Sequence, residues 1–447
     1  MKNEMAQNQA YLKQCEHGLN QARESGDPRA LSLALADYAY ALSINKRRDE
    51  AMDYFYEAEV IAGQDVDDIN VLAHGLGLRS LVYQEGKRLP DAYQMANKML
   101  RIAVAENDPQ IECDAIANQA QILLDSGKLE GAFRRFQEAE NLAKVIGDDQ
   151  RLMRIKGALA NLSLSIPSLD EAEKYYRQTI SLAENVGEEE ALIGYTGNLG
   201  SVLQWKGKHE EAIEVFQDIL PYHEKIQGKD KLLEVLKKLV KSYADLQDNE
   251  HIYEYGFRGL GLIDEQEDEV VFDFLEPVIM AYYREGKMQK AHNMISEAIT
   301  IARSMGDQER EVEFLMNLGE SFVASEMLDR AQEIYEDALE GALDLEKATY
   351  EAYLKGRLGY VAAELGNLEA AVKHHREAIE MAQEQHLAKL EAEQRSMLAM
   401  AFQERGEMDM AREQAQNAVE LFERLELEDS AQHARRLLKG LLVVQRK

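Results

Sequence analysis

The segment GYTGNLGSVLQWKGK, residues 194–208, contains residue types that could cradle a phosphate. Its glycines at 194, 197 and 200 stand three apart, and the pair Gly207-Lys208 follows them. In nucleotide-binding loops, such glycines let backbone N–H groups approach a phosphate, and the lysine neutralises its charge. That chemistry needs a strand before the glycines and a Ser or Thr after the Gly-Lys pair. The sequence has neither, so it favours a structural role for these glycines.

Other residues that could do chemistry also lack the required spacing. His374 and His375 are adjacent, and adjacent residues on a helix face different ways, so they do not form a zinc site. The second glycine cluster, GFRGLGL at residues 256–262, lies in a helical pattern, and no serine or cysteine has the context of a nucleophile. We therefore predict no catalytic residue, no metal ligand and no cofactor, and an enzyme with an unrecognised site is the alternative.

Composition and charge restrict the partners and the compartment. The chain has 447 residues and a formal net charge of −31, which disfavours binding to nucleic acid or to anionic lipid. Its two cysteines, Cys15 and Cys113, have no CxxC spacing, which is typical of a reducing compartment and predicts a cytoplasmic location. No apolar run approaches the roughly 20 residues of a membrane span, so we predict no membrane insertion.

A repeat explains the glycines and organises the chain. Segments such as GKHEEAIEVFQDIL, GKLEGAFRRFQEAE and GNLEAAVKHHREAI are related, and each has an alanine at the same place after a turn, its sixth residue. The steps between successive positions of this frame are 39 to 41 residues, and Ile252 fills one position. The frame alanines are Ala51, Ala92, Ala132, Ala172, Ala212, Ala291, Ala331, Ala371 and Ala411.

Each period contains two helical patterns with a turn between them. The turn carries Gly86, Gly127, Gly207, Gly286, Gly366 or Gly406, which suits a left-handed residue after a helix. Asp27-Pro28 and Asp108-Pro109 are typical of helix starts, and we expect Pro90 in a turn between helices. Twelve residues before the frame alanine, Gly200, Gly319 and Gly359 share a position with alanines elsewhere, which predicts a slot where two helices cross.

These positions resemble the tetratricopeptide repeat. With the frame alanine as position 20, that signature has a small residue at position 8, glycine at the turn and an aromatic at position 24. NLGSVLQWKGKHEEAIEVF carries it through Gly200, Gly207, Ala212 and Phe216. The period exceeds the usual 34, as in the long-repeat branch that is similar to kinesin light chains, Pins-type scaffolds, Rap-type receptors and the maltose-regulator sensor region. HEAT and armadillo repeats share the period but not this frame.

The resemblance implies an all-α fold, a right-handed solenoid of about ten helix pairs stacked into a superhelix. We expect an N-terminal capping helix in residues 1–26, a continuous array in residues 27–427 and a C-terminal capping helix in residues 428–447.

In this family the first helix of each pair lines a concave groove. The resemblance places a partner-binding set there, with polar and cationic residues in the middle and acidic residues toward the C-terminal half. Asn118, Asn198 and Asn317 share position 6, where asparagine either contacts a ligand backbone or is ordinary consensus, and Trp205 either packs or anchors a partner. The predicted groove residues are Arg154, Asn161, Asn198, Ser201, Trp205, Lys237, Lys241, Tyr283, Arg284, Asn317 and Tyr360.

A lysine cluster runs against the charge of the chain. Lys237 and Lys241 are four residues apart and share a helix face within the Lys-rich segment 225–241. One interpretation pairs these lysines with Glu234, Asp273 and Glu276, and the other has them receive an acidic segment of a partner. The resemblance predicts a non-enzymatic scaffold that binds a protein or peptide segment. The alternative is a peptide-responsive regulator of the Rap or maltose-regulator type, whose superhelix changes shape.

Overall fold

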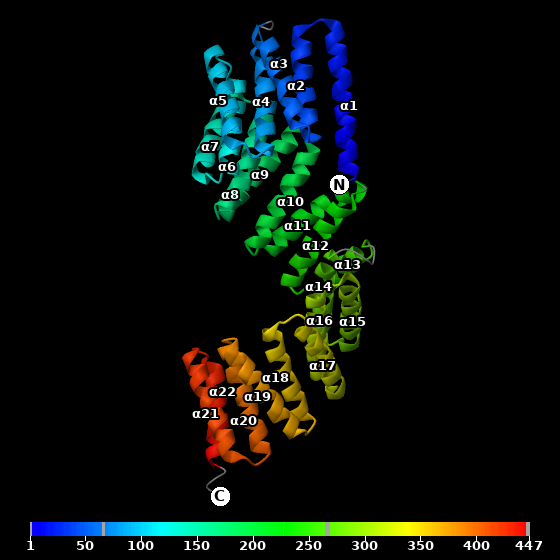
Figure 1. The fold of residues 1–447 in the computed structure, drawn as a ribbon, viewed down its shortest axis with the longest axis vertical. Helices are drawn as coiled ribbons and strands as arrows, with labels where there is room; N and C mark the ends of the chain where they lie inside the picture. The colour runs from blue at the N-terminus through cyan, green and yellow to red at the C-terminus, as the bar shows by residue number, and fades with distance from the viewer. Residues whose placement is uncertain (1, 65–67, 227, 264–268, 444–447) are drawn as a thin grey trace. The chain divides into compact units, whose positions relative to one another are not determined.

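The computed structural model of the chain describes residues 2–64, 68–226, 228–263 and 269–443. In these residues every regular element is an α-helix, 22 helices in all, which confirms the predicted all-α repeat fold. Contacts divide the chain into two compact units, Met1–Lys225 and Ile226–Lys447 (Figure 1). Each unit is described below by itself.

Unit 1 holds five helix pairs preceded by one helix. The single helix is α1 (Lys2–Ser25), in the place where the sequence predicts an N-terminal cap. The first helices of the pairs are α2 (Pro28–Ile44), α4 (Ile69–Glu85), α6 (Pro109–Asp125), α8 (Asp149–Ser165) and α10 (Glu189–Trp205). The second helices are α3 (Arg48–Gln64), α5 (Leu89–Glu106), α7 (Leu129–Ile146), α9 (Leu169–Val186) and α11 (His209–Lys225).

Unit 2 repeats the same pattern. Its first helices are α12 (Lys229–Asp245), α14 (Val270–Arg284), α16 (Gln308–Ala324), α18 (Ala348–Glu364) and α20 (Ala388–Glu404). The second helices are α13 (Asn249–Leu260), α15 (Met288–Met305), α17 (Leu328–Asp344), α19 (Leu368–Glu384) and α21 (Met408–Arg424), and α22 (Glu428–Val443) follows them. The irregular segment 247–269 that the sequence indicates includes α13, and its residues 264–268 lie outside the described ones.

Local sequence signals set the helix ends. Aspartates at 27, 68, 108, 148, 248 and 307 precede helices and accept hydrogen bonds from backbone N–H groups of the first turn. Gly127, Gly207, Gly286, Gly366 and Gly406 adopt positive φ, as predicted. Two predictions were wrong. Lys87, not Gly86, takes the left-handed conformation after α4, and Pro90 lies inside the first turn of α5, where its missing N–H costs nothing.

The predicted slot at position 8 is confirmed by the packing between the two helices of a pair. A Cβ atom on Gly200 would lie 2.4 Å from the ring of Phe216, and one on Gly319 would lie 2.4 Å from the ring of Tyr335. Alanines occupy the same slot elsewhere and are fully buried. The glycines of GFRGLGL also serve packing, because a Cβ on Gly259 would overlap the ring of Phe274.

First helices of successive pairs also contact one another. In unit 1, α4 contacts both α2 and α6, and α6 contacts α8. In unit 2, α14 contacts α12, and α18 contacts α20. The side chains on this shared face are therefore the ones that can act together across several repeats.

Candidate binding cavity

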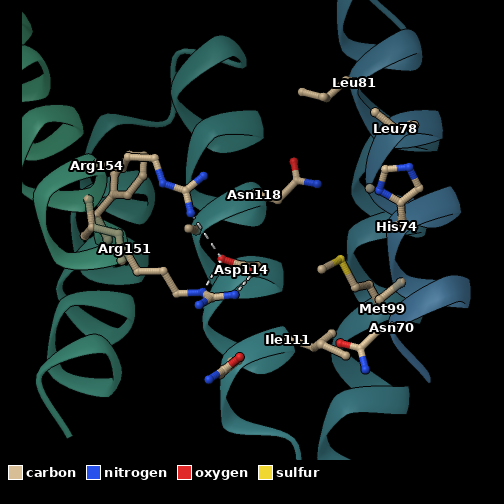
Figure 2. A pocket seen from close by; sticks show the side chains of 16 residues that line it. Asn70, His74, Leu78, Leu81, Met99, Ile111, Asp114, Asn118, Arg151 and Arg154 are labelled. Atoms are coloured by element: carbon tan, nitrogen blue, oxygen red, sulfur yellow. Dashed lines mark hydrogen bonds and ion pairs between the residues drawn. The ribbon is translucent and has the colours of Figure 1, made fainter. Parts of the chain in front are cut away.

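A cavity of about 490 Å³ lies on the first-helix face of unit 1. Three consecutive first helices, α4, α6 and α8, provide most of its walls, and α5 and α7 each add one residue (Figure 2). Its lining residues are Asn70, Ala73, His74, Gly77, Leu78, Leu81, Met99, Gln110, Ile111, Asp114, Ala117, Asn118, Phe136, Arg151, Arg154 and Ile155.

Small residues at one repeat position open this cavity. Position 5 is Gly77 in α4 and Ala117 in α6, and both line the cavity. A Cβ atom on Gly77 would have no neighbour within 4 Å, so the space above this backbone is open. The small side chains leave room between α4 and α6, two first helices that contact each other.

The next repeat has the same small residue, but its space is filled. Gly157 occupies position 5 of α8, and a Cβ there would lie 2.5 Å from the hydroxyl of Tyr195. Tyr195 is on α10 and is half-buried, so its ring covers the place that remains open above Gly77. We attribute the end of the cavity at α8 to this tyrosine.

Asp114 and Arg151 form an ion pair with two hydrogen bonds in the cavity. The Nε and Nη2 groups of Arg151 each donate a hydrogen bond of 2.9 Å to one carboxylate oxygen of Asp114, which joins α8 to α6. The Nη1 group of Arg151 also donates to Asp148, the N-cap of α8. The hydrogen bonds to Asp114 raise the pKa of Arg151, so the guanidinium stays charged.

Two further polar side chains turn into the cavity. Arg154 reaches from α8 toward α6, where its guanidinium lies 3.8 Å from Asp114 (Figure 2). Asn118 extends from α6 on the side that faces α4, and its Oδ1 atom lies 3.4 Å from the hydroxyl of Ser80. Both groups can therefore offer N–H donors to a ligand.

Apolar side chains form the opposite wall. Leu78 and Leu81 project from α4, and Leu81 is 42% exposed. Met99 and Ile111 are buried, and His74 lies beside Leu78 and pairs with Asp37 of α2 at 2.8 Å. An apolar wall facing a few oriented polar groups is the usual composition of a ligand site.

The five predicted groove residues of unit 1 are not gathered in one place. Arg154 lines the cavity, whereas Asn161, Asn198, Ser201 and Trp205 do not. Asn161 accepts a hydrogen bond from Tyr176, and Ser201 donates one to the backbone of its own helix. Trp205 is 59% exposed at the end of α10, so it does not pack in the core.

The other six predicted residues belong to unit 2. Lys237 pairs with Asp273 at 3.2 Å, which agrees with the interpretation that these lysines serve neighbouring repeats, while Lys241 is exposed. Arg284 donates to Asn249, and Asn317 is exposed on α16. The hydroxyl of Tyr283 is enclosed rather than presented on the surface, and the ring of Tyr360 lies 5.2 Å from the guanidinium of Arg357.

A serine and a histidine also meet in unit 2, but without access to a substrate. The Nε2 atom of His292 lies 2.7 Å from the hydroxyl of Ser321. Both residues are only 5% exposed, and burial lowers the pKa of His292. The contact therefore links α15 to α16 inside the core. Across the described residues, no three His, Cys, Asp or Glu side chains gather as a metal ion would require.

Sequence reasoning missed most of the cavity. Asp114, Arg151 and the apolar wall were not predicted, and Asn118 was noted only as a repeat position. A signal was present, because position 5 is small in five consecutive repeats: Ala36, Gly77, Ala117, Gly157 and Gly197. That pattern indicates open space on the first-helix face. It does not show in which repeats a side chain from a neighbouring helix fills that space. No helix in the described part of the chain has the length and hydrophobicity of a membrane span.

Two family sequence models match parts of the chain. The sequence model of the tetratricopeptide repeat matches residues 352–385, and the model of anaphase-promoting complex subunit 5 matches residues 272–322. No curated protein sequence matches the chain.

Solved structures with related folds have low sequence identity to the chain. The apo form of RapI has a TM-score of 0.53 at 13% identity, covering 79% of this chain and 98% of RapI. The signal transduction ATPase PH0952 from Pyrococcus horikoshii, which has a tetratricopeptide-repeat sensor, has a TM-score of 0.48 at 13% identity, covering 92% of this chain and 69% of that one. The apo form of the quorum sensor NprR from B. thuringiensis has a TM-score of 0.42 at 14% identity, covering 78% of this chain and 97% of NprR. The likeness to RapI supports the fold alone. The tetratricopeptide-repeat model matches one repeat, residues 352–385, and the helix pairs of the described residues have the fold of such a repeat array.

Proposed function

We propose that the chain is a non-enzymatic binding protein that holds a peptide or a segment of another protein on the first-helix face of unit 1. The cavity between α4, α6 and α8 is the anchoring site. The observation that carries this proposal is the cavity itself, since the first helices of three successive repeats line one open space.

The size and chemistry of the cavity support peptide binding. Its volume of about 490 Å³ falls in the range of roughly 300–1,000 Å³ that is usual for ligand sites. Leu78 and Leu81 offer apolar contact, and Asn118 and Arg154 offer donors that an extended peptide backbone or side chain can use. A peptide crossing three helices would meet both kinds of group.

The lining residues favour binding over catalysis. Among the described residues that line the cavity, none is a serine, threonine, cysteine or lysine. The one carboxylate, Asp114, is engaged by Arg151 through both of its oxygens. This composition supports a non-enzymatic function, because nucleophilic catalysis needs a nucleophile beside a base.

The cysteines support a cytoplasmic setting for this function. Cys15 and Cys113 are both free thiols, and Cys113 is buried in α6. Unpaired cysteines are typical of proteins in a reducing compartment. The strongly acidic composition disfavours nucleic acid as the partner.

Binding can be tested with a fluorescent positional-scanning library of heptapeptides and the full chain. The best-bound sequence would be synthesised, and its dissociation constant measured for the wild-type chain and for two variants. Gly77→Leu fills the open space, and Gly440→Leu places the same side chain in open space on α22. We expect Gly77→Leu to weaken binding by about tenfold, because the ligand loses apolar burial there, and Gly440→Leu to leave it unchanged.

Two results would overturn the proposal. One is a library in which no sequence binds the chain, and the other is a selected peptide that binds Gly77→Leu as tightly as wild type. Small-angle scattering with the selected peptide then separates two modes of action. Unchanged dimensions fit a scaffold, and a large compaction fits the peptide-responsive regulator.

A further inference from the structure

The space above position 5 of a first helix is filled by a residue at position 3 of the next first helix. In unit 1, Gly157 at position 5 of α8 faces Tyr195, which occupies position 3 of α10. In unit 2, Gly356 at position 5 of α18 faces Gln394 at position 3 of α20, and a Cβ on Gly356 would lie 2.6 Å from its carboxamide. The same two repeat positions therefore meet in both units.

The open cavity has a small residue at this covering position. Position 3 of α6 is Ala115, which is fully buried and has no ring or amide to place above Gly77. The Cβ position of Gly77 accordingly has no neighbour within 4 Å. Where position 5 is glycine, the size of the position 3 residue in the next repeat thus decides whether an anchoring space is open.

Tyr195 fills the space above Gly157 with its ring. A Cβ atom on Gly157 would lie 2.5 to 2.6 Å from the hydroxyl, Cε1 and Cζ atoms of Tyr195, so the far end of the ring rests on the backbone of α8. The ring centroid also lies 6.5 Å from that of Tyr176, and burial raises the pKa of Tyr195. Because a phenol ring occupies this space, its removal would leave room for an aromatic side chain of a ligand.

The spaces above Gly77 and Gly157 are two first helices apart. Packed helices have axes roughly 8–10 Å apart, so two steps span about 16–20 Å. An extended peptide advances about 3.3–3.6 Å per residue, so about five or six residues cover that span. One peptide would therefore reach both spaces if both were open.

We infer that Tyr195 determines the specificity of the cavity. It limits the ligand to one anchoring side chain, above Gly77, and closes the space above Gly157 to a second, aromatic anchor about five or six residues away. This inference rests on the proposed function and names the residue that decides which segment fits. The ligand is a peptide or protein segment with a single apolar anchor at this face.

Extended forms of the tightest heptapeptide test the inference. Six residues of Gly and Ser are added before or after it, and each added position is replaced in turn by Phe. We expect one of these Phe peptides to bind the Tyr195→Ala chain about tenfold more tightly than its parent, because the ring enters the vacated space. For the wild-type chain we expect no Phe to change the dissociation constant by more than about twofold.

Two further variants locate the effect. Gly157→Leu combined with Tyr195→Ala refills the same space, and we expect it to remove the gain from Phe. Tyr222→Ala is the matched control, because Tyr222 is another half-buried tyrosine of unit 1 but lies on the second helix α11, and it should behave as wild type. If circular dichroism shows that Tyr195→Ala has lost helicity, Tyr195→Val provides the same test with a smaller gap.

The outcomes separate this inference from the proposed function. If no library peptide binds the wild-type chain, the function and the inference both fail. If a peptide binds and Gly77→Leu weakens it, the function stands. The inference is then overturned when no Phe improves binding to Tyr195→Ala, or when Phe improves binding to wild type equally. A gain that Gly157→Leu does not remove also overturns it.

Discussion

The ring of Phe216 lies directly over the backbone of Gly200, so close that a Cβ atom on residue 200 would be 2.4 Å from the ring. Phe216 is fully buried in α11, and Gly200 is buried in α10. Gly319 and Tyr335 repeat the contact in unit 2 at the same separation. The small residue at position 8 and the aromatic at position 24 are thus one packing unit, which sets how closely the two helices of a pair approach.

We predict that Gly200→Ala lowers the free energy of unfolding by about 1–3 kcal/mol, because the added methyl group must displace a buried ring. Gly194→Ala is the control. It lies on the same helix with nothing within 4 Å of its Cβ position, and it should be neutral or stabilising by up to about 1 kcal/mol. Urea unfolding followed by circular dichroism measures both. Equal stabilities of the two variants would contradict this packing.

Two lysines that share one carboxylate should differ in their effect on stability. Lys156 and Lys144 each lie 2.7 Å from Glu140, but the Lys156 side chain is 9% exposed and that of Lys144 is 50% exposed. Lys156→Met should cost about 2–3 kcal/mol of unfolding free energy, since Glu140 and Gln178 lose a buried donor. Lys144→Met should cost less than about 1 kcal/mol. Denaturant titration measures the free energy of unfolding of both variants. Similar losses in the two would argue against a buried Lys156–Glu140 pair.

The buried histidine at position 375 should make the chain acid-sensitive. His375 is 1% exposed, and burial lowers its pKa to about 4 despite its hydrogen bond to Gln394. In the unfolded chain the pKa is near the ordinary 6.5, so between pH 6.5 and 4 the unfolded state binds more protons. Stability contributed by this site is therefore present above pH 6.5 and is lost as the pH falls to about 4.

The variant His375→Phe isolates this effect. Residue 375 stands opposite Gly359 as Phe216 stands opposite Gly200, so a phenyl ring suits the slot. We expect the thermal unfolding temperature of His375→Phe to fall less between pH 6.5 and 4 than that of wild type. The unfolding temperature of the control His17→Phe, on α1, should fall as much as that of wild type. A decline in His375→Phe as steep as in wild type would show that His375 does not titrate in this window.

The fold could be predicted from the sequence because each repeat carries the same packing and helix-end residues at the same spacing. Gly200 and Phe216 face each other twelve and four residues from Ala212, and the same spacing recurs wherever the pair recurs. Aspartate before a helix and glycine after one act within a single turn, so their roles can be read without tertiary structure. The errors at Gly86 and Pro90 were displacements of one or two residues at helix ends, where capping has several solutions.

The cavity could not be predicted in the same way, because it depends on which side chains fill equivalent spaces. Gly77 and Gly157 occupy the same repeat position, yet the space above Gly157 is filled by Tyr195 and the space above Gly77 is open. Arg151 and Arg154 both lie on α8, and only the structure shows that Arg151 takes both oxygens of Asp114. The position of a residue in the repeat therefore predicts the face on which it lies, but not its partners.

The central claim is that α4, α6 and α8 hold a peptide, and a crystal structure of the full chain with the tightest library peptide tests it most directly. We predict that the peptide lies between these helices, with an acceptor at Asn118 and an apolar side chain against Leu78. A peptide bound elsewhere, with the space above Gly77 empty, would contradict the claim.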